Sequence, residues 1–119
     1  HPRTRKQIEA SGLNLLVRKL RVIEPLAFLD MVALEQNAKV ILTDSGGVQK
    51  EAFFYGVPCV TMRDETEWTE TVEHGWNQLT GADTHAIVSA ARSAKQGRPA
   101  SPYGCGRAGE SILDTMLNA

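Results

Sequence analysis

The sequence predicts an α/β fold, namely a Rossmann-like three-layer domain with a short parallel sheet. Two short runs, residues 40–43 and 57–62, are apolar on both faces, as in strands that are covered on both sides. The residues between them have helical spacing, and Val48, Ala52 and Tyr55 fall on one stripe. Because a parallel strand pair needs such a crossover, we expect a strand–helix–strand unit at the centre of the domain.

Glycine and proline mark the boundaries of this central unit. Gly56 is expected to end the helix, because glycine readily adopts the left-handed conformation found just beyond many helix ends. Pro58 suits the first residue of the second strand, where no ladder hydrogen bond is required of it.

The elements before the central unit are less sharply defined. We expect a helix over residues 2–10, an edge strand over residues 19–23, and then a helix with Pro25 at its first position that runs as far as residues 36–37. Residues 13–17 are apolar without a strong period, and their state is left open.

The elements after the central unit continue the alternation. The sequence predicts a helix over residues 68–74 with Thr66 as its N-cap, a last short strand over residues 76–79, and a helix capped by Asp83. A loop over residues 97–106, rich in glycine and proline, should precede a closing helix. We expect one single domain over residues 1–119.

Composition excludes several function classes. A net charge of −1 gives no general basic field, so no nucleic-acid partner is expected, and no apolar run is long enough for a membrane partner. Cys59 and Cys105 are far apart and fit a reducing compartment, which indicates the cytoplasm. His1, His74 and His85 do not have metal-ligand spacing, so no metal site is expected.

The turn over residues 44–47 carries the predicted binding site. It joins the end of a strand to the start of a helix, where the first N–H groups lack partners and the helix dipole favours negative charge. Gly46 and Gly47 remove the Cβ atoms that would keep an anion away, so a phosphate site is expected. Glu51 follows four residues beyond Gly47 and could accept hydrogen bonds from a ribose. At this point a plain helix cap with a tight turn stays equally open.

Three stretches of the chain resemble the non-hydrolysing UDP-N-acetylglucosamine 2-epimerases. The central one is TDSGGVQKEAFFYGVPCVTMRDETEWTETVEHGWNQLTGAD, and the opening HPRT and the closing YGCGRAGESILDTML also match that family's pattern. The resemblance covers nearly the whole chain in the same order, and the block DSGGxQxE…G-P…R-x-x-T-E is specific.

The resemblance implies a fold and a reaction. Such enzymes have two Rossmann-like domains in the glycosyltransferase-B arrangement, with the active site in the cleft between them. They invert C2 of a UDP-linked 2-acetamido sugar by removing the C2 proton and eliminating UDP, and UDP then adds back after reprotonation on the other face. The resemblance implies no cofactor, neither metal nor nicotinamide. It also implies a cytoplasmic enzyme of cell-surface polysaccharide biosynthesis.

The resemblance also implies roles for individual residues. UDP or a UDP-sugar would be bound through its phosphates by Ser45, Gly46 and Gly47, and through its ribose by Glu51. His1 would lie in the cleft as a catalytic residue near the sugar diphosphate. Four residues of one short segment would help to shape the cleft: Arg63, Thr66, Glu67 and Trp68. A structural alternative for Arg63 is an ion pair with Asp64 or Glu67.

Two departures from the family affect the expected activity. Several members have an arginine where this chain has Trp68, whose ring could instead pack against the sugar or the uracil. The family's acid and base carboxylates come from an amino-terminal domain that this chain lacks. We therefore expect a truncated carboxy-terminal portion that does not epimerise alone, with that missing domain as a partner. An exposed sheet edge and apolar face also predict a homodimer.

Two other function classes stay open. One is the donor-binding half-domain of a glycosyltransferase, because a Gly-Gly turn with a downstream glutamate also serves nucleotide-sugar donors there. The segment MRDETEWTE argues against it, since it matches the epimerase pattern. The other is a non-catalytic UDP-binding or oligomerisation module from a free-standing gene fragment. A phospho-receiver domain is disfavoured, because no acidic pair ends an earlier strand to accompany Asp44.

Overall fold

The computed structural model describes residues 2–118. The chain divides into two units, one that ends at Ala33 and one that begins at Leu34, and each is described by itself. Within the described residues, no helix combines the length and the apolar character needed to cross a membrane.

The first unit begins with two helices, α1 (Pro2–Ala10) and α2 (Asn14–Val17). The predicted first helix is confirmed by α1. Residues 13–17, whose state was left open, contain the short helix α2. An ion pair of 2.9 Å joins Arg5 Nη2 to Glu24 Oε1, and both side chains are largely exposed. Exposed pairs of this kind contribute little to stability.

Two predictions for this region are wrong, namely the edge strand over residues 19–23 and the helix start at Pro25. The amide of Lys19 donates to the carbonyl of Leu16 at 3.1 Å, so the chain continues to turn after α2 and then has no regular structure. An alternating pattern becomes a strand only beside a pairing partner, and the sheet of the described residues offers none here. Helix α3 (Phe28–Gln36) begins after Pro25, and nothing in the structure explains the delay.

The sheet of the second unit has three parallel strands in the order β1–β2–β3. They are β1 (Ile41–Thr43), β2 (Cys59–Thr61) and β3 (Asn77–Leu79), and their first residues lie opposite one another across the sheet. All three residues of the central strand β2 are buried. This arrangement confirms the short parallel sheet, and Cys59 at the start of its central strand is 3% exposed.

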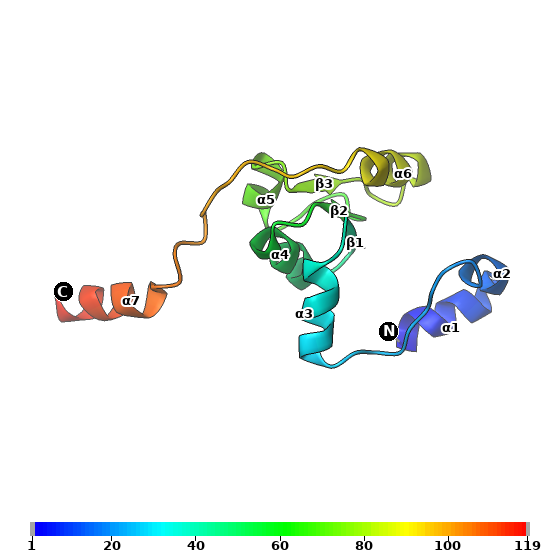
Figure 1. Ribbon diagram of the computed structural model, residues 1–119, viewed down its shortest axis with the longest axis horizontal. Coiled ribbons are helices and arrows are strands. Elements are labelled where there is room, and N and C mark those ends of the chain that lie inside the picture. Colours follow the sequence, from blue (N-terminus) through cyan, green and yellow to red (C-terminus); the bar gives the residue numbers. More distant parts are fainter. Residues whose placement is uncertain (1, 119) are drawn as a thin grey trace. The chain divides into compact units, whose positions relative to one another are not determined.

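Helices cover both faces of this sheet. Helix α4 (Gly46–Tyr55) packs against β1 and β2, α5 (Thr69–Glu73) against β3, and α6 (Thr84–Ser93) against β2. Figure 1 shows α4 and α5 on one side of the strands and α6 on the other. The three-layer α/β architecture is therefore confirmed.

The buried stripe of α4 differs from the predicted one. Its buried residues are Gln49, Ala52 and Phe53, with Gln49 and Ala52 at 0% exposure, whereas Val48 and Tyr55 are only half-buried. A glutamine was not expected at the centre of the contact. Its side-chain oxygen accepts hydrogen bonds from neighbouring elements, as described below, whereas its Nε2 has no partner within the described residues.

The helix ends follow the predicted signals in most places. Gly56 ends α4 in the left-handed region with φ of 68°, and the Asp83 side chain accepts the amide of Ala86 at 2.6 Å at the start of α6. Thr66, however, is not the N-cap of α5. That helix begins at Thr69 with Trp68 at the cap position, because the Thr66 hydroxyl is engaged elsewhere.

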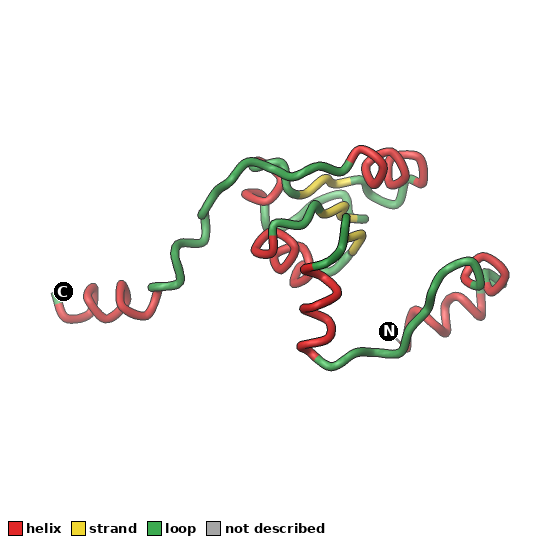
Figure 2. Tube along the Cα trace, viewed as in Figure 1, coloured by secondary structure: helices red, strands yellow, loops and turns green. Residues whose placement is uncertain are grey.

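A long connection follows α6 and leads to α7 (Ala108–Leu117), as Figure 2 shows in green. Its start is fixed at Gly97, where an added Cβ would stand 2.5 Å from the His74 carbonyl oxygen and 2.6 Å from Trp76 Cδ1. The Arg98 amide donates to the His74 carbonyl at 2.8 Å, and the Trp76 indole N–H donates to the Arg98 carbonyl at 2.9 Å. The connection is thus held against the end of α5 before it reaches the loop that contains Tyr103.

Candidate functional site

The candidate site lies where β1 ends and α4 begins. Ser45 is the N-cap of α4, and its side chain accepts the amide of Val48 at 3.5 Å. The Ser45 amide donates to the buried Thr43 hydroxyl at 3.0 Å, which fixes the turn to the strand. The amides of Gly46 and Gly47 belong to the first turn, where no carbonyl within the helix is available to them. They therefore face outward at the positive end of the helix dipole, as an anion site requires.

The two glycines of the turn have different surroundings. A Cβ added at Gly47 would have only the Ser45 hydroxyl oxygen as a neighbour, at 3.8 Å. A Cβ added at Gly46 would instead be surrounded by three side-chain atoms: Trp68 Nε1 at 3.4 Å, Glu67 Oε2 at 3.6 Å and Arg63 Nη1 at 4.0 Å. The structure thus places the predicted phosphate-binding turn beside three of the predicted cleft residues. These three belong to residues 62–68, which we call the site segment.

Arg63 and Glu67 form a two-pronged ion pair within the site segment. Arg63 Nη2 lies 2.9 Å from Glu67 Oε1, and Nη1 lies 3.2 Å from Oε2. The hydrogen bond from Arg63 lowers the pKa of Glu67, and the hydrogen bond to Glu67 raises the pKa of Arg63. Their side chains are 30% and 59% exposed, respectively, so the pair is reachable from solvent. The ion-pair alternative for Arg63 is therefore realised in the structure, next to the glycine turn.

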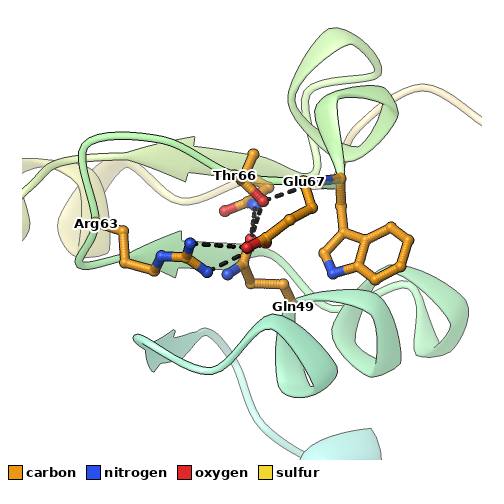
Figure 3. A network of polar contacts seen from close by, with 6 residues as sticks. Gln49, Arg63, Thr66 and Glu67 are labelled. Atoms are coloured by element: carbon orange, nitrogen blue, oxygen red, sulfur yellow. Dashed lines mark hydrogen bonds and ion pairs between the residues drawn. The ribbon is translucent and has the colours of Figure 1, made fainter.

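Thr66 connects the site segment to α4 and to the sheet. Its hydroxyl donates to Gln49 Oε1 at 2.6 Å and accepts the Trp68 amide at 3.1 Å. Asn77 Nδ2 at the start of β3 donates to the same Gln49 oxygen at 3.1 Å. Figure 3 shows the Arg63–Glu67 pair together with Thr66 and Gln49. This network holds the site segment in place, and it engages the hydroxyl that the sequence placed in the cleft.

The Trp68 ring is held by an aromatic and cationic cluster. Lys50 Nζ lies 4.1 Å from the centre of the Trp68 ring and 4.5 Å from that of Tyr103, and the two rings meet edge to face at 6.1 Å. The Tyr103 hydroxyl donates to Glu70 Oε2 at 3.2 Å, and burial, followed by Glu70, raises the pKa of Tyr103 to about 12. The Tyr103 phenol is therefore uncharged at neutral pH.

Sequence reasoning missed Gln49, Lys50 and Tyr103 as supporting residues of this site. Gln49 precedes Ala52 and Phe53 by three and four residues, and that spacing is the signal that places it on the buried face. For Lys50 and Tyr103 there was no such signal, because they meet only through the fold. Tyr103 comes from the glycine- and proline-rich loop, far along the chain from α4.

Glu51, the predicted ribose ligand, lies one turn into α4 and is half-buried. Its neighbourhood contains a second carboxyl group, that of Glu35 at the end of α3. Glu35 is 4% exposed and its Oε1 has no hydrogen-bond partner; burial, followed by the charge of Glu51, raises the pKa of Glu35. The predicted catalytic residue His1 lies outside the described residues. Among the residues described, no group of three or more His, Cys, Asp or Glu side chains is placed to hold a metal.

Comparison with known proteins identifies relatives over nearly the whole chain. The family model described as UDP-N-acetylglucosamine 2-epimerase matches residues 1–117. The UDP-2,3-diacetamido-2,3-dideoxy-D-glucuronate 2-epimerase of Pseudomonas aeruginosa is 56% identical over 93 residues, which cover 78% of this chain and 25% of that protein. A UDP-N-acetylglucosamine 2-epimerase homolog of Methanococcus maripaludis is 44% identical over 126 residues, which cover 99% of this chain and 34% of that protein.

Solved structures agree with these relatives. The UDP-GlcNAc 2-epimerase of Methanocaldococcus jannaschii matches with a TM-score of 0.85 at 40% identity, covering 100% of this chain and 34% of that one. A second structure from the same organism, in complex with UDP-GlcNAc and UDP, matches with a TM-score of 0.78 at 39% identity and the same coverage. This chain thus spans about a third of the length of these relatives. Because the family model spans nearly every residue, the chain belongs to the UDP-N-acetylglucosamine 2-epimerase family.

Proposed function

We propose that this chain is the UDP-binding carboxy-terminal portion of a UDP-sugar 2-epimerase. The observation that carries the proposal is the meeting of the first-turn amides of α4 with the N–H groups of Arg63 and Trp68 around Gly46. A diphosphate is held where several N–H donors and a positive potential coincide. The complex of the M. jannaschii relative with UDP-GlcNAc and UDP supports the same class of ligand.

Within this proposal the glycine turn holds the phosphates. The Gly46 and Gly47 amides and the Ser45 hydroxyl donate to phosphate oxygens, and Arg63 turns from Glu67 toward the anion. Such an exchange is feasible because an exposed ion pair is worth only about 0–1 kcal/mol. Glu51, one helical turn further along α4, accepts hydrogen bonds from the two ribose hydroxyls.

The proposed reaction of the full-length protein is inversion at C2 of a UDP-linked 2-acetamido sugar. The C2 proton is removed, the bond between C1 and the diphosphate oxygen breaks, and UDP adds back after a proton is delivered to the other face. No metal or nicotinamide is required. The residues described here stabilise the charge on the departing diphosphate, and the fixed N–H groups act on that charge as it develops. His1 lies near the sugar diphosphate in this proposal.

The base for proton removal is proposed to come from the rest of the protein. Glu67 is an acid close to Gly46, with its Oε2 3.6 Å from the position that a Cβ of Gly46 would take, and the hydrogen bond from Arg63 lowers its pKa. A carboxylate stabilised in this way is a poor proton acceptor. The chain alone is therefore expected to bind UDP without epimerising. Conversion of UDP-GlcNAc to UDP-ManNAc by the purified chain, above background, would contradict this.

We propose two candidate sugars for the UDP-linked substrate. The P. aeruginosa relative, named for a diacetamido glucuronate, is 56% identical, and this similarity favours a UDP-linked diacetamido sugar acid as a second candidate beside UDP-GlcNAc. In either case we place the enzyme in the cytoplasm and in the synthesis of cell-surface polysaccharide.

The partners proposed for the chain are the other domain of the full-length enzyme and a second copy of itself. The apolar residues of α7 are exposed and form part of the surface available for such contacts: Ile112, Leu113, Met116 and Leu117. Light scattering at high concentration checks the self-association, and a monomer would argue against it.

Calorimetric titration with UDP tests the phosphate site directly. The substitution Gly47→Val places a branched side chain over the first-turn amides, while only the Ser45 hydroxyl lies within 4 Å of the new Cβ. We expect UDP binding to weaken by about tenfold or more, since a phosphate hydrogen bonded to several donors is displaced. Gly109→Val is the matched control, because Gly109 also lies in the first turn of a helix and has nothing within 4 Å.

Two results of this titration would each overturn the phosphate site. Equal UDP affinity in the wild type and Gly47→Val would overturn the phosphate site. Equal losses in Gly47→Val and Gly109→Val would assign the effect to folding and overturn it as well.

A further inference from the structure

Trp68 has an N–H group that the protein itself does not use. Its Nε1 atom is shielded from solvent and has no hydrogen-bond partner. The other tryptophan, Trp76, donates its indole N–H to the Arg98 carbonyl at 2.9 Å. A buried N–H without an acceptor is costly and rare, so an orphaned donor beside a candidate site indicates a missing ligand atom.

The orientation of this N–H is fixed by contacts on the rest of the residue. The Trp68 amide donates to the Thr66 hydroxyl at 3.1 Å, Lys50 Nζ lies 4.1 Å from the ring centre, and Tyr103 meets the ring edge to face. A cation over the ring adds attraction to the packing. The indole is therefore held in position before any ligand arrives, and Lys50 already covers one face of the ring.

The N–H is close to the glycine turn. Nε1 stands 3.4 Å from the position that a Cβ of Gly46 would take, and Arg63 Nη1 stands 4.0 Å from the same point. The indole nitrogen thus flanks the first turn of α4 from the side of the site segment. An anion bound to the first-turn amides would come within reach of this donor as well.

We propose that Trp68 Nε1 donates a hydrogen bond to a phosphate oxygen of the nucleotide diphosphate bound at Gly46 and Gly47. This inference rests on the proposed function and makes Trp68 a ligand-binding residue through its N–H, not through stacking on the sugar or the uracil. An indole carries no net charge, unlike a guanidinium. Its contribution to binding therefore depends little on salt concentration, whereas that of Arg63 falls as salt rises.

Nitrogen–proton correlation spectra test the contact on the unaltered chain. The sequence contains two tryptophans, so two indole signals are expected, and Trp68→Phe and Trp76→Phe assign them by loss. On addition of UDP or of pyrophosphate, the Trp68 indole proton should move downfield, and the Trp76 indole proton should stay in place. A Trp68 signal unmoved at saturating UDP would overturn the inference, whatever the variants do.

Calorimetry with the same two variants measures the contribution. Trp68→Phe keeps an aromatic ring next to Lys50 and Tyr103 but removes the donor, and it should weaken UDP binding by about tenfold while leaving uridine binding unchanged. Trp76→Phe, the matched control, should bind UDP as the wild type does. Wild-type affinity in Trp68→Phe would overturn the contact and leave the glycine turn intact. A wild-type chain that binds no UDP would instead overturn the proposed function and this inference together.

Discussion

The side-chain oxygen of Gln49 accepts a hydrogen bond of 2.6 Å from the hydroxyl of Thr66. Gln49 is fully buried on α4, and Thr66 stands in the site segment between Arg63 and Trp68. This single bond therefore links the helix that carries the glycine turn to the segment that carries the charged and aromatic groups beside it.

Removing the Gln49 amide should destabilise the fold. Gln49→Met leaves the Thr66 hydroxyl without its acceptor in a buried place and removes one of the two acceptors of Asn77 Nδ2, which we expect to cost about 1–3 kcal/mol. Urea unfolding measures the loss. Gln78→Met is the control, because Gln78 is exposed on β3 and its replacement should change stability by less than about 0.5 kcal/mol. Similar losses in both variants would contradict the role of the network.

Replacing Glu51 should weaken binding of the ribose part of the nucleotide without affecting binding of the diphosphate. Glu51→Gln keeps the size of the side chain but removes the charge that favours two hydrogen bonds from a diol. We expect UDP and uridine to bind about fivefold or more weakly, with no change for pyrophosphate. Calorimetry with the three ligands checks this. A parallel loss for pyrophosphate would show that Glu51 supports the turn and does not touch the ribose.

Neutralising Glu67 should strengthen the binding of anions. Its Oε2 lies 3.6 Å from the position of a Gly46 Cβ and occupies the guanidinium of Arg63, so it both repels an incoming phosphate and competes for its donor. Glu67→Gln should tighten pyrophosphate binding several-fold, and Arg63→Gln should weaken it. The stability of Glu67→Gln should change by less than about 1 kcal/mol, because the pair is exposed. Weaker pyrophosphate binding by Glu67→Gln would indicate that the pair must stay intact.

Glu35 should make stability depend on pH in the acid range. Burial and the neighbouring Glu51 raise its pKa, so the folded chain keeps this proton at pH values where the unfolded chain has lost it. Stability from this group is greatest below the unfolded-state pKa and falls as pH rises through the folded-state pKa. Glu35→Gln should therefore gain stability over the wild type as pH rises from 4 toward 7. A difference between the two proteins that stays constant in urea unfolding across this range would contradict the prediction.

The parts of the fold that could be predicted are those with strong local signals. The apolar runs around β1 and β2, the helix between them and the stop at Gly56 are all encoded within short stretches. Ser45, Gly46 and Gly47 could be identified as a helix start for the same reason. The proximity of Arg63, Glu67 and Trp68 to that turn was implied by family resemblance, since spacing along the chain does not show it.

The remaining features depend on contacts between distant residues. The alternation of residues 19–23 resembles a strand, but a strand forms only where a neighbour pairs with it. Gln49 is polar and was not expected in the core, and the donors to its side-chain oxygen, Thr66 and Asn77, come from distant parts of the chain. Tyr103 reaches Trp68 across a loop without periodicity, so the cluster that holds the indole had no signal in the sequence.

Gly97 extends the candidate site beyond the groups proposed to contact a ligand. No side chain fits at this position, because the His74 carbonyl and the Trp76 ring fill the space. A larger residue would displace the connection that leads to Tyr103, and Tyr103 would then lose its edge-to-face contact with Trp68. The proposed recognition of a nucleotide is thus sensitive to a remote residue, where a substitution should impair binding while every residue of the candidate site keeps its identity.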